Sequence, residues 1–258
     1  MKVNVYSLTG KKTGTMELPS VFEEDVRPDL IKRAVLSSQS ARHQPQGRDP
    51  FAGKRTSAES WGPGRGVSRV TRVKGSGYSA GGRGAFIPQA VGGRLAHPPS
   101  VEKRIIKKVN VKERRKATAS AIAATGIKEL VEKRGHMIDK VPEFPLVVSN
   151  ELEGVKTAKE ITGVFSKLGL SGDLERAKDR KVRAGKGTMR GRRYKKKKSA
   201  LLVVSEDKGI FSGAGNHSGI DVVKAEHVGV EHLAPGTHYG RLTVYTESAI
   251  GRIAERFK

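Results

Sequence analysis

The sequence contains no cysteine. Disulfide bonds and thiolate metal sites are therefore excluded, and the composition favours an intracellular protein. The sequence also lacks any apolar run of about 18 residues, the length that a membrane helix needs. Its first residues, MKVNVYSLTGKKTG, lack the apolar stretch of a secretory signal peptide. We therefore expect a soluble, cytoplasmic protein without a membrane partner.

Acidic residues are scarce: 26 stand against 50 lysines and arginines, which gives a net charge of +24. Such an excess indicates an anionic partner, either nucleic acid or a membrane surface. The charge is concentrated in two segments. Residues 42–98, the basic loop, carry ten basic and two acidic residues, and residues 178–198, the basic segment, carry twelve basic residues and one acidic residue. The basicity therefore belongs to these segments and not to a uniformly charged surface.

Signatures of catalysis and of cofactor binding are also missing. The glycines of residues 75–80 match a loose dinucleotide-binding fingerprint, but their flanks are glycine-rich coil where a strand and a helix are required. Residues 185–188 lack the upstream glycine of a phosphate loop. The histidines at 217, 227, 232 and 238 lack metal-site spacing. We predict no active site, no metal, no cofactor and no small-molecule substrate.

The regular elements alternate between apolar strands and helices. Strands are predicted at 3–8, 15–18, 145–149, 200–206, 220–225 and 242–246, and helices at 28–41, 127–134, 157–168, 173–179, 230–234 and 247–257. This alternation is typical of an α/β fold with a mostly parallel sheet and flanking helices. We expect one globular α/β domain, made of residues 1–41 and 99–258, into which the long, irregular basic loop is inserted.

A further helix is expected from Val101, where Ile105, Ile106 and Val109 form an apolar stripe, into the alanine-rich stretch 117–124. Basic residues occupy most of the other positions of this helix before Ala117. They form either a solvated face or a contact with the same anion that the basic loop binds, and the sequence favours neither interpretation.

The basic loop shows no sustained apolar period, so it cannot fold by burying its own surface. Arginine binds phosphate with two donors, glycine lets the backbone approach a folded polyanion, and sparse aromatic residues offer surfaces on which bases stack. Together these features favour RNA binding over a solvating linker. The predicted RNA-binding residues are Arg42, Arg48, Lys54, Arg55, Trp61, Arg65, Arg69, Arg72, Lys74, Arg83, Arg94, Arg183, Lys186, Arg190, Arg192, Arg193, Lys195 and Lys196.

Two alternatives remain open from the residues alone. An RNA-processing enzyme would use the same basic segments to present its substrate, but it also needs an acid/base or metal cluster. A DNA-binding protein would satisfy the electrostatics equally well. The sequence has no helix-turn-helix or zinc-finger spacing that would place a helix in a major groove, and this disfavours DNA.

Three motifs resemble one family. They are SWGPGRGVSR at 60–69, with the later GGRGAF at 81–86 and GGR at 92–94; RAGKGTMRGRR at 183–193; and LAPGTHYGR at 233–241, followed by TESA at 246–249. In this order they are similar to ribosomal protein L-four of the large subunit, in its archaeal and eukaryotic form. The chain ends soon after the third motif, which favours the archaeal form.

The resemblance implies a structural constituent of the large ribosomal subunit that binds its rRNA and neighbouring ribosomal proteins. It also implies that the tip of the long loop helps to line the nascent-peptide exit tunnel. Carried onto this chain, the tip residues are Gly64, Arg65, Arg69, Arg72, Lys74 and Gly75. The basic segment would be a second rRNA anchor.

Overall fold

The structure is a computed structural model that describes residues 1–257. Its contacts divide the chain into two compact units. The globular unit consists of Met1–Gln39 and the chain from Lys108 onward, and the loop unit is Ser40–Lys107. The basic loop lies entirely within the loop unit.

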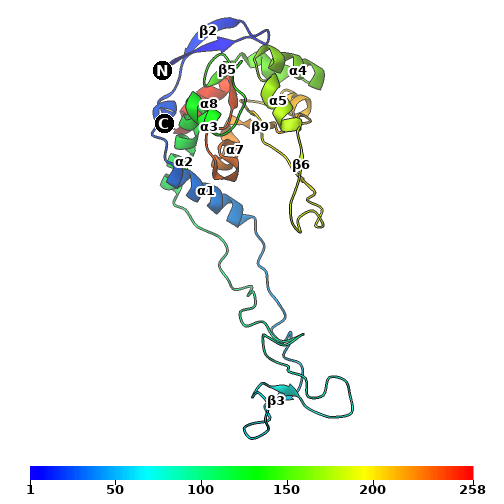
Figure 1. The fold of residues 1–258 in the computed structure, drawn as a ribbon. Coiled ribbons are helices and arrows are strands. Elements are labelled where there is room, and N and C mark those ends of the chain that lie inside the picture. The colour runs from blue at the N-terminus through cyan, green and yellow to red at the C-terminus, as the bar shows by residue number, and fades with distance from the viewer. Residues whose placement is uncertain (258) are drawn as a thin grey trace. The chain divides into compact units, whose positions relative to one another are not determined.

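A six-stranded sheet forms the centre of the globular unit (Figure 1). Its strands, in spatial order, are β2 (Lys12–Glu17), β1 (Lys2–Tyr6), β5 (Leu146–Val148), β10 (Thr243–Thr246), β8 (Leu201–Val204) and β9 (Asp221–Lys224). β1 and β2 form an antiparallel hairpin, whereas β1–β5, β5–β10, β10–β8 and β8–β9 are all parallel pairs. The mostly parallel sheet predicted from the sequence is therefore confirmed.

Helices cover both faces of this sheet. The α-helices are α1 (Pro28–Ala41), α2 (Val111–Ala123), α3 (Lys128–Lys133), α4 (Ala158–Lys167), α5 (Ser171–Lys178), α6 (Ile210–Ala214), α7 (Val230–Leu233) and α8 (Glu247–Phe257). Short 3-10 helices are η1 (Ser20–Glu23), η2 (Ala124–Gly126), η3 (Asn150–Gly154), η4 (Ala225–His227) and η5 (Pro235–Thr237). No helix within the described residues is both long and apolar enough to cross a membrane.

Alternate residues of the central strands point into two separate apolar clusters, because side chains alternate across a strand. Val203 and Tyr245 belong to the cluster that α1, α2, α7 and α8 cover. Leu202 and Val244 belong to the cluster that α3, α4, α5 and α6 cover. Both faces of the central strands are therefore buried, and this explains why β8 reads as an unbroken apolar run.

Helix α4 shows how local sequence sets an element's limits. The Thr157 hydroxyl accepts a hydrogen bond of 3.3 Å from the Glu160 amide and so caps the first turn. Ile161, Val164 and Phe165 follow helical spacing and are buried against the sheet. The amphipathic helix predicted from this pattern is confirmed.

The helix predicted from Val101 is wrong in its first half, because α2 begins only at Val111. The expected apolar stripe is not buried as one face, since Ile106 is 59% exposed whereas Ile105 and Val109 are half-buried. Lysine and arginine at 103, 104, 107 and 108 would also repel one another at helical spacing. The basic residues of α2 itself lie in its exposed first turns, so both interpretations of their role remain open.

Candidate RNA-binding surfaces

The basic segment forms a hairpin that extends from the globular unit (Figure 1). Strand β6 (Lys181–Val182) pairs antiparallel with β7 (Tyr194–Lys195), and the Arg183 amide donates to the Arg193 carbonyl at 2.7 Å. The Thr188 hydroxyl donates to the Arg183 carbonyl at 2.5 Å and closes the turn. We call residues 181–195 the basic hairpin.

Tyr194 contacts two arginines, Arg193 of the hairpin and Arg180 directly before it. The guanidinium carbons of Arg180 and Arg193 lie 5.5 and 5.6 Å from the centre of its ring. Both distances are within the range of a cation–π interaction. Stacking orients the planar guanidinium groups while their N–H edges stay available for phosphate oxygens.

Most predicted RNA-binding residues of the basic segment point into solvent without an acidic partner in the described structure. The acidic residue of the segment, Asp179, pairs with Lys197 at 2.8 Å and so neutralises none of the predicted residues. Arg183 is only half-exposed, because its Nε donates to the Arg192 carbonyl at 3.0 Å. The exposed residues are Lys186, Arg190, Arg192, Arg193, Lys195 and Lys196.

The base of the hairpin is fixed by a buried carboxylate, Asp173. It accepts hydrogen bonds from Arg176 Nε at 2.8 Å and from the Ser199 hydroxyl at 2.5 Å, and His136 Nδ1 lies 3.1 Å from each of its oxygens. Burial by itself would raise the pKa of Asp173. The hydrogen bonds from His136, Arg176 and Ser199 outweigh burial and hold its pKa well below the usual range.

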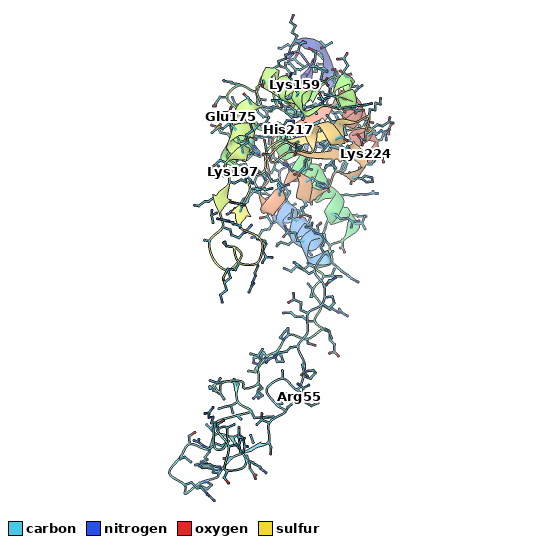
Figure 2. The ribbon with its side chains drawn as sticks, turned by 90° about the vertical axis from the view of Figure 1, so that its right-hand side faces the viewer. Arg55, Lys159, Glu175, Lys197, His217 and Lys224 are labelled. Carbon is cyan, nitrogen blue, oxygen red and sulfur yellow. The ribbon has the colours of Figure 1, made fainter. Side chains whose placement is uncertain are left out.

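A groove of about 740 Å³ lies beside this base, entirely within the globular unit. Six lysines and two arginines line it, together with His136, His238, Tyr239 and Leu130. Lys197 lies near the point where the hairpin joins the domain (Figure 2). Lys133, Arg134 and Arg176 of this groove were not predicted from the sequence, because they lie outside the basic segment and come together only in the fold.

Arg134 is the most enclosed cation of the groove that lacks a carboxylate partner in the described structure. Its guanidinium donates to the carbonyls of Leu233, Pro235 and His238. Burial, followed by the charges of Arg241 and Arg176, lowers its pKa to about 10. Arg176, Lys197 and Lys198 of the groove pair with Asp173, Asp179 and Asp221, at 2.8 Å each. The excess positive charge of the groove therefore comes from Arg134 and from its other lysines.

Arg241, within the third motif, has a structural role. It is 1% exposed, lies 2.7 Å from Asp221 and donates to the carbonyls of Ser199 and His232 at 2.9 Å each. These bonds join the base of the hairpin to the loop before β10. Its charge is therefore used inside the fold.

The loop unit contains a small antiparallel arrangement of three segments. β3 (Ala58–Glu59) pairs with β4 (Arg72–Val73), and Arg72 forms a bridge to Gly84. The Val73 amide donates to the Arg83 carbonyl at 2.9 Å, and the Val73 side chain is buried. The basic loop is thus held together mainly by backbone hydrogen bonds.

Three predicted RNA-binding cations are engaged inside the loop unit. Arg72 lies 5.1 Å from the centre of the Trp61 ring and donates to the Gly82 carbonyl at 3.0 Å. Lys74 pairs with Glu59 at 2.5 Å, and Arg55 pairs with Asp49. Both acidic residues of the basic loop are therefore used by its own cations.

The other predicted RNA-binding residues of the loop differ in exposure. Arg94 is half-buried, and Trp61 is 46% exposed despite its contact with Arg72. The exposed arginines and lysines are Arg42, Arg48, Lys54, Arg65, Arg69 and Arg83. Arg65 and Arg69 lie in the connection between β3 and β4.

Two glycines shape the predicted tip. Gly64 has φ +84°, in the left-handed region that favours glycine. Gly75 has φ +100°, and a side chain there would collide with the Tyr78 ring, whose hydroxyl donates to the Lys74 carbonyl. These positions allow the tight turns on either side of β4.

No group of three or more histidine, aspartate or glutamate side chains is placed to hold a metal ion within residues 1–257. The candidate surfaces described above are cationic. Comparison with known proteins identifies the family. The sequence profile of the Ribosomal protein L4/L1 family matches residues 16–256.

The chain belongs to this family.

Three relatives illustrate the likeness, each called large ribosomal subunit protein uL4. That of Methanopyrus kandleri is 56% identical over 257 residues, which cover 99% of each chain. That of Methanosphaera stadtmanae is 54% identical over 100% of this chain and 98% of its own, and that of Methanococcus vannielii is 53% identical over the whole of both. The relatives are archaeal, which confirms the resemblance to the archaeal form.

The three motifs that resemble the L4/L1 family occupy distinct places in the structure. Residues 60–69 lie in the connection between β3 and β4, residues 183–193 form most of the basic hairpin, and residues 233–241 border the groove. Membership of a ribosomal-protein family also confirms that the chain is a structural protein and not an enzyme.

Proposed function

We propose that this chain is a structural constituent of the large subunit of the cytoplasmic ribosome and binds large-subunit rRNA through the basic loop, the basic hairpin and the globular unit. The name that its relatives share, large ribosomal subunit protein uL4, supports a place in the large subunit. The observation that carries the RNA-binding role is the distribution of charge. Exposed cations without acidic partners, among them Arg65, Arg69 and Arg190, gather on the two segments predicted from the sequence.

The basic loop suits insertion between packed RNA helices. Phosphates that approach each other repel, and arginines carried on a thin strand reduce this repulsion where a globular surface has no room. The exposed rings of Trp61 and Tyr78 offer surfaces on which bases stack. The globular unit then fixes where the loop enters the RNA and contacts neighbouring ribosomal proteins.

We further propose that the tip lines the nascent-peptide exit tunnel. Gly64, Arg65 and Arg69 would form the exposed wall, while Arg72 and Lys74, which are engaged with Trp61 and Glu59, maintain its shape. Gly75 would permit the turn that follows. The small residues from Ser76 to Ala80 would leave a surface to which a growing peptide does not adhere.

Sedimentation of a cell extract through a high-salt sucrose gradient tests whether the chain is part of the large ribosomal subunit. We expect the chain to migrate with the large subunit, because a loop threaded through RNA cannot be released by screening its exposed phosphate contacts alone. Recovery only at the top of the gradient would contradict an integral ribosomal role and favour the RNA-enzyme or DNA-binding alternatives.

A site-specific cross-linker tests whether the loop tip lies beside the nascent peptide in the exit tunnel. With a photoreactive residue at position 65 or 69, we expect a stalled nascent peptide to be captured. The same residue at position 159, on α4 of the globular unit, serves as the control and should capture none. Absence of capture from both tip positions would exclude the tunnel role while leaving rRNA binding intact.

A further inference from the structure

The groove beside the basic hairpin combines cations with one unusual acceptor. Its described lining includes six lysines and two arginines and no acidic side chain. His136 also lines it, and the His136 ring is only 1% exposed. Its Nε2 is buried and has no hydrogen-bond partner among the described residues. A buried polar atom without a partner is a rare and unfavourable feature, so it points to a ligand or water that completes it.

The neighbours of His136 decide which of its nitrogens carries the proton. Nδ1 lies 3.1 Å from both oxygens of Asp173, whose pKa is held far below 7, so this carboxylate can only accept hydrogen bonds. Nδ1 must therefore carry hydrogen and donate. Arg176 Nη2, at 3.3 Å from the same nitrogen, is another donor and does not compete for that proton.

We expect the ring also to be neutral at pH 7. Burial lowers the pKa of His136, and this effect exceeds the opposing influence of Asp173. A neutral ring with hydrogen on Nδ1 has a lone pair on Nε2. His136 therefore offers a buried acceptor in a groove whose charged side chains are all donors.

We propose that this groove holds a sugar–phosphate unit of RNA, with the phosphate against its lysines and arginines and the ribose 2′-hydroxyl donating to His136 Nε2. This inference rests on the proposed rRNA-binding function and adds a position at which RNA is distinguished from DNA. A ligand that fits must carry anionic oxygens and a hydroxyl donor close together. A ribose phosphate has both, whereas a deoxyribose phosphate lacks the donor.

The surrounding bonds show that the acceptor is held in a fixed place. Asp173 is itself bound by Arg176, by Ser199 and by the Met137 amide, at 2.8, 2.5 and 3.2 Å. Arg176 also donates to the Lys198 carbonyl at 2.8 Å and so ties the ring to the base of the hairpin. The His136 ring is thereby fixed relative to the chain that follows the hairpin.

The full-length chain and two trinucleotides of adenosine, one ribo and one deoxyribo, provide the test. We expect the ribo form to bind about fivefold more tightly, the effect of one hydrogen bond. In ¹⁵N spectra, only the ribo form should move the His136 Nε2 resonance, which in the free chain should be that of an unprotonated nitrogen. This resonance reports on the groove even if the probe also binds elsewhere.

The variant His136→Asn removes Nε2 while its amide can still donate to Asp173, so the base of the hairpin stays supported. We expect it to bind the two trinucleotides equally. Lys133→Ala, which removes a lysine that lines the groove, should weaken the binding of both trinucleotides by the same factor and preserve the ratio of the two affinities. Lys224→Ala, on strand β9, is the control and should change neither the affinity for the ribo trinucleotide nor that for the deoxyribo trinucleotide (Figure 2).

An unchanged ribo-to-deoxyribo ratio in His136→Asn, or an unmoved Nε2 resonance at saturation, would overturn the inference. Either result would leave the proposed function intact if the wild-type chain still sediments with the large subunit. Failure of the wild-type chain to do so would instead remove the proposed function, whatever the trinucleotides show.

Discussion

Asp173 illustrates how a buried side chain can support a binding surface without being part of that surface. It is fully buried and holds His136, Arg176 and Ser199 at the base of the hairpin. Removing one partner of a buried ionic network leaves the other charges without compensation, which is far more destabilising than losing a surface pair.

We therefore expect Asp173→Asn to lower the free energy of unfolding by about 3 kcal/mol, measured by urea denaturation at pH 7. Asp139→Asn removes an exposed carboxylate three residues after His136 and should change the free energy of unfolding by less than about 0.5 kcal/mol. Equal effects of the two substitutions would show that the buried network contributes nothing.

The same carboxylate predicts sensitivity to acid. Its folded-state pKa is depressed, so the folded chain binds this proton less readily than the unfolded chain does. The stability it contributes is complete above the ordinary carboxyl pKa of about 4 and is lost as the pH falls towards the folded value. The difference in unfolding free energy between wild type and Asp173→Asn should therefore shrink below about pH 4. A difference that stays constant down to pH 2 would contradict this prediction.

Trp61 is the one tryptophan of the chain, so its fluorescence reports on the basic loop alone. Arg72→Ala removes the cation above its ring and should shift the emission to longer wavelength as water replaces the guanidinium. Arg48→Ala, an exposed change elsewhere in the loop, is the matched control. Identical spectra for wild type and Arg72→Ala would mean that the stack does not form in the free chain.

At the scale of elements, the basic hairpin concentrates charge on a short pair of strands. Its two-residue strands are exposed and bury little apolar surface, so the Tyr194 stacks and the bonds at its base hold it. Most of its cations remain available to an external anion, because Asp179 is occupied by Lys197.

Removing hairpin cations should therefore weaken RNA binding in a salt-dependent way. For a transcript of large-subunit rRNA, we expect the double variant Arg190→Ala/Arg192→Ala to reduce the slope of log affinity against log salt by about 0.7 for each lost contact. Lys159→Ala, on α4, removes a cation away from the hairpin and should leave the slope unchanged (Figure 2). An unaltered slope in the double variant would show that these arginines do not contact phosphate.

At the scale of the whole molecule, the apolar core that stabilises the fold and the basic loop proposed to bind RNA belong to different units. Neither apolar cluster of the globular unit contains a residue of 42–98. The loop unit relies on backbone bonds, and Val73 is its one buried apolar side chain in the described structure. The core therefore does not depend on the segment proposed to enter RNA.

Replacing residues 42–98 by a flexible linker should accordingly leave a folded globular unit, with a melting temperature within a few degrees of wild type by circular dichroism. The same variant should lose its association with the large subunit at high salt, because the threaded segment is gone. A variant that fails to fold would show that the loop contributes to the core. One that stays bound at high salt would show that the basic hairpin and globular unit suffice.

The sequence by itself determined the fold class, most elements, the two basic segments and the family resemblance. These features are local: α4 follows from the Thr157 cap and a 3.6-residue apolar period, and β8 from an unbroken run of buried residues. The family comparison, which matches residues 16–256, agrees with the resemblance drawn from three short motifs.

Tertiary structure alone decided which charges remain available. The sequence could not show that Arg72, Lys74 and Arg55 are engaged within the loop, because their partners are set by chain folding and not by spacing. It could not place Arg134 in a groove with the hairpin lysines, since these residues lie far apart along the chain. The helix predicted from the sequence also began too early, at Val101, whereas α2 begins at Val111. An apolar stripe predicts a helix only where the fold supplies a surface that buries the stripe.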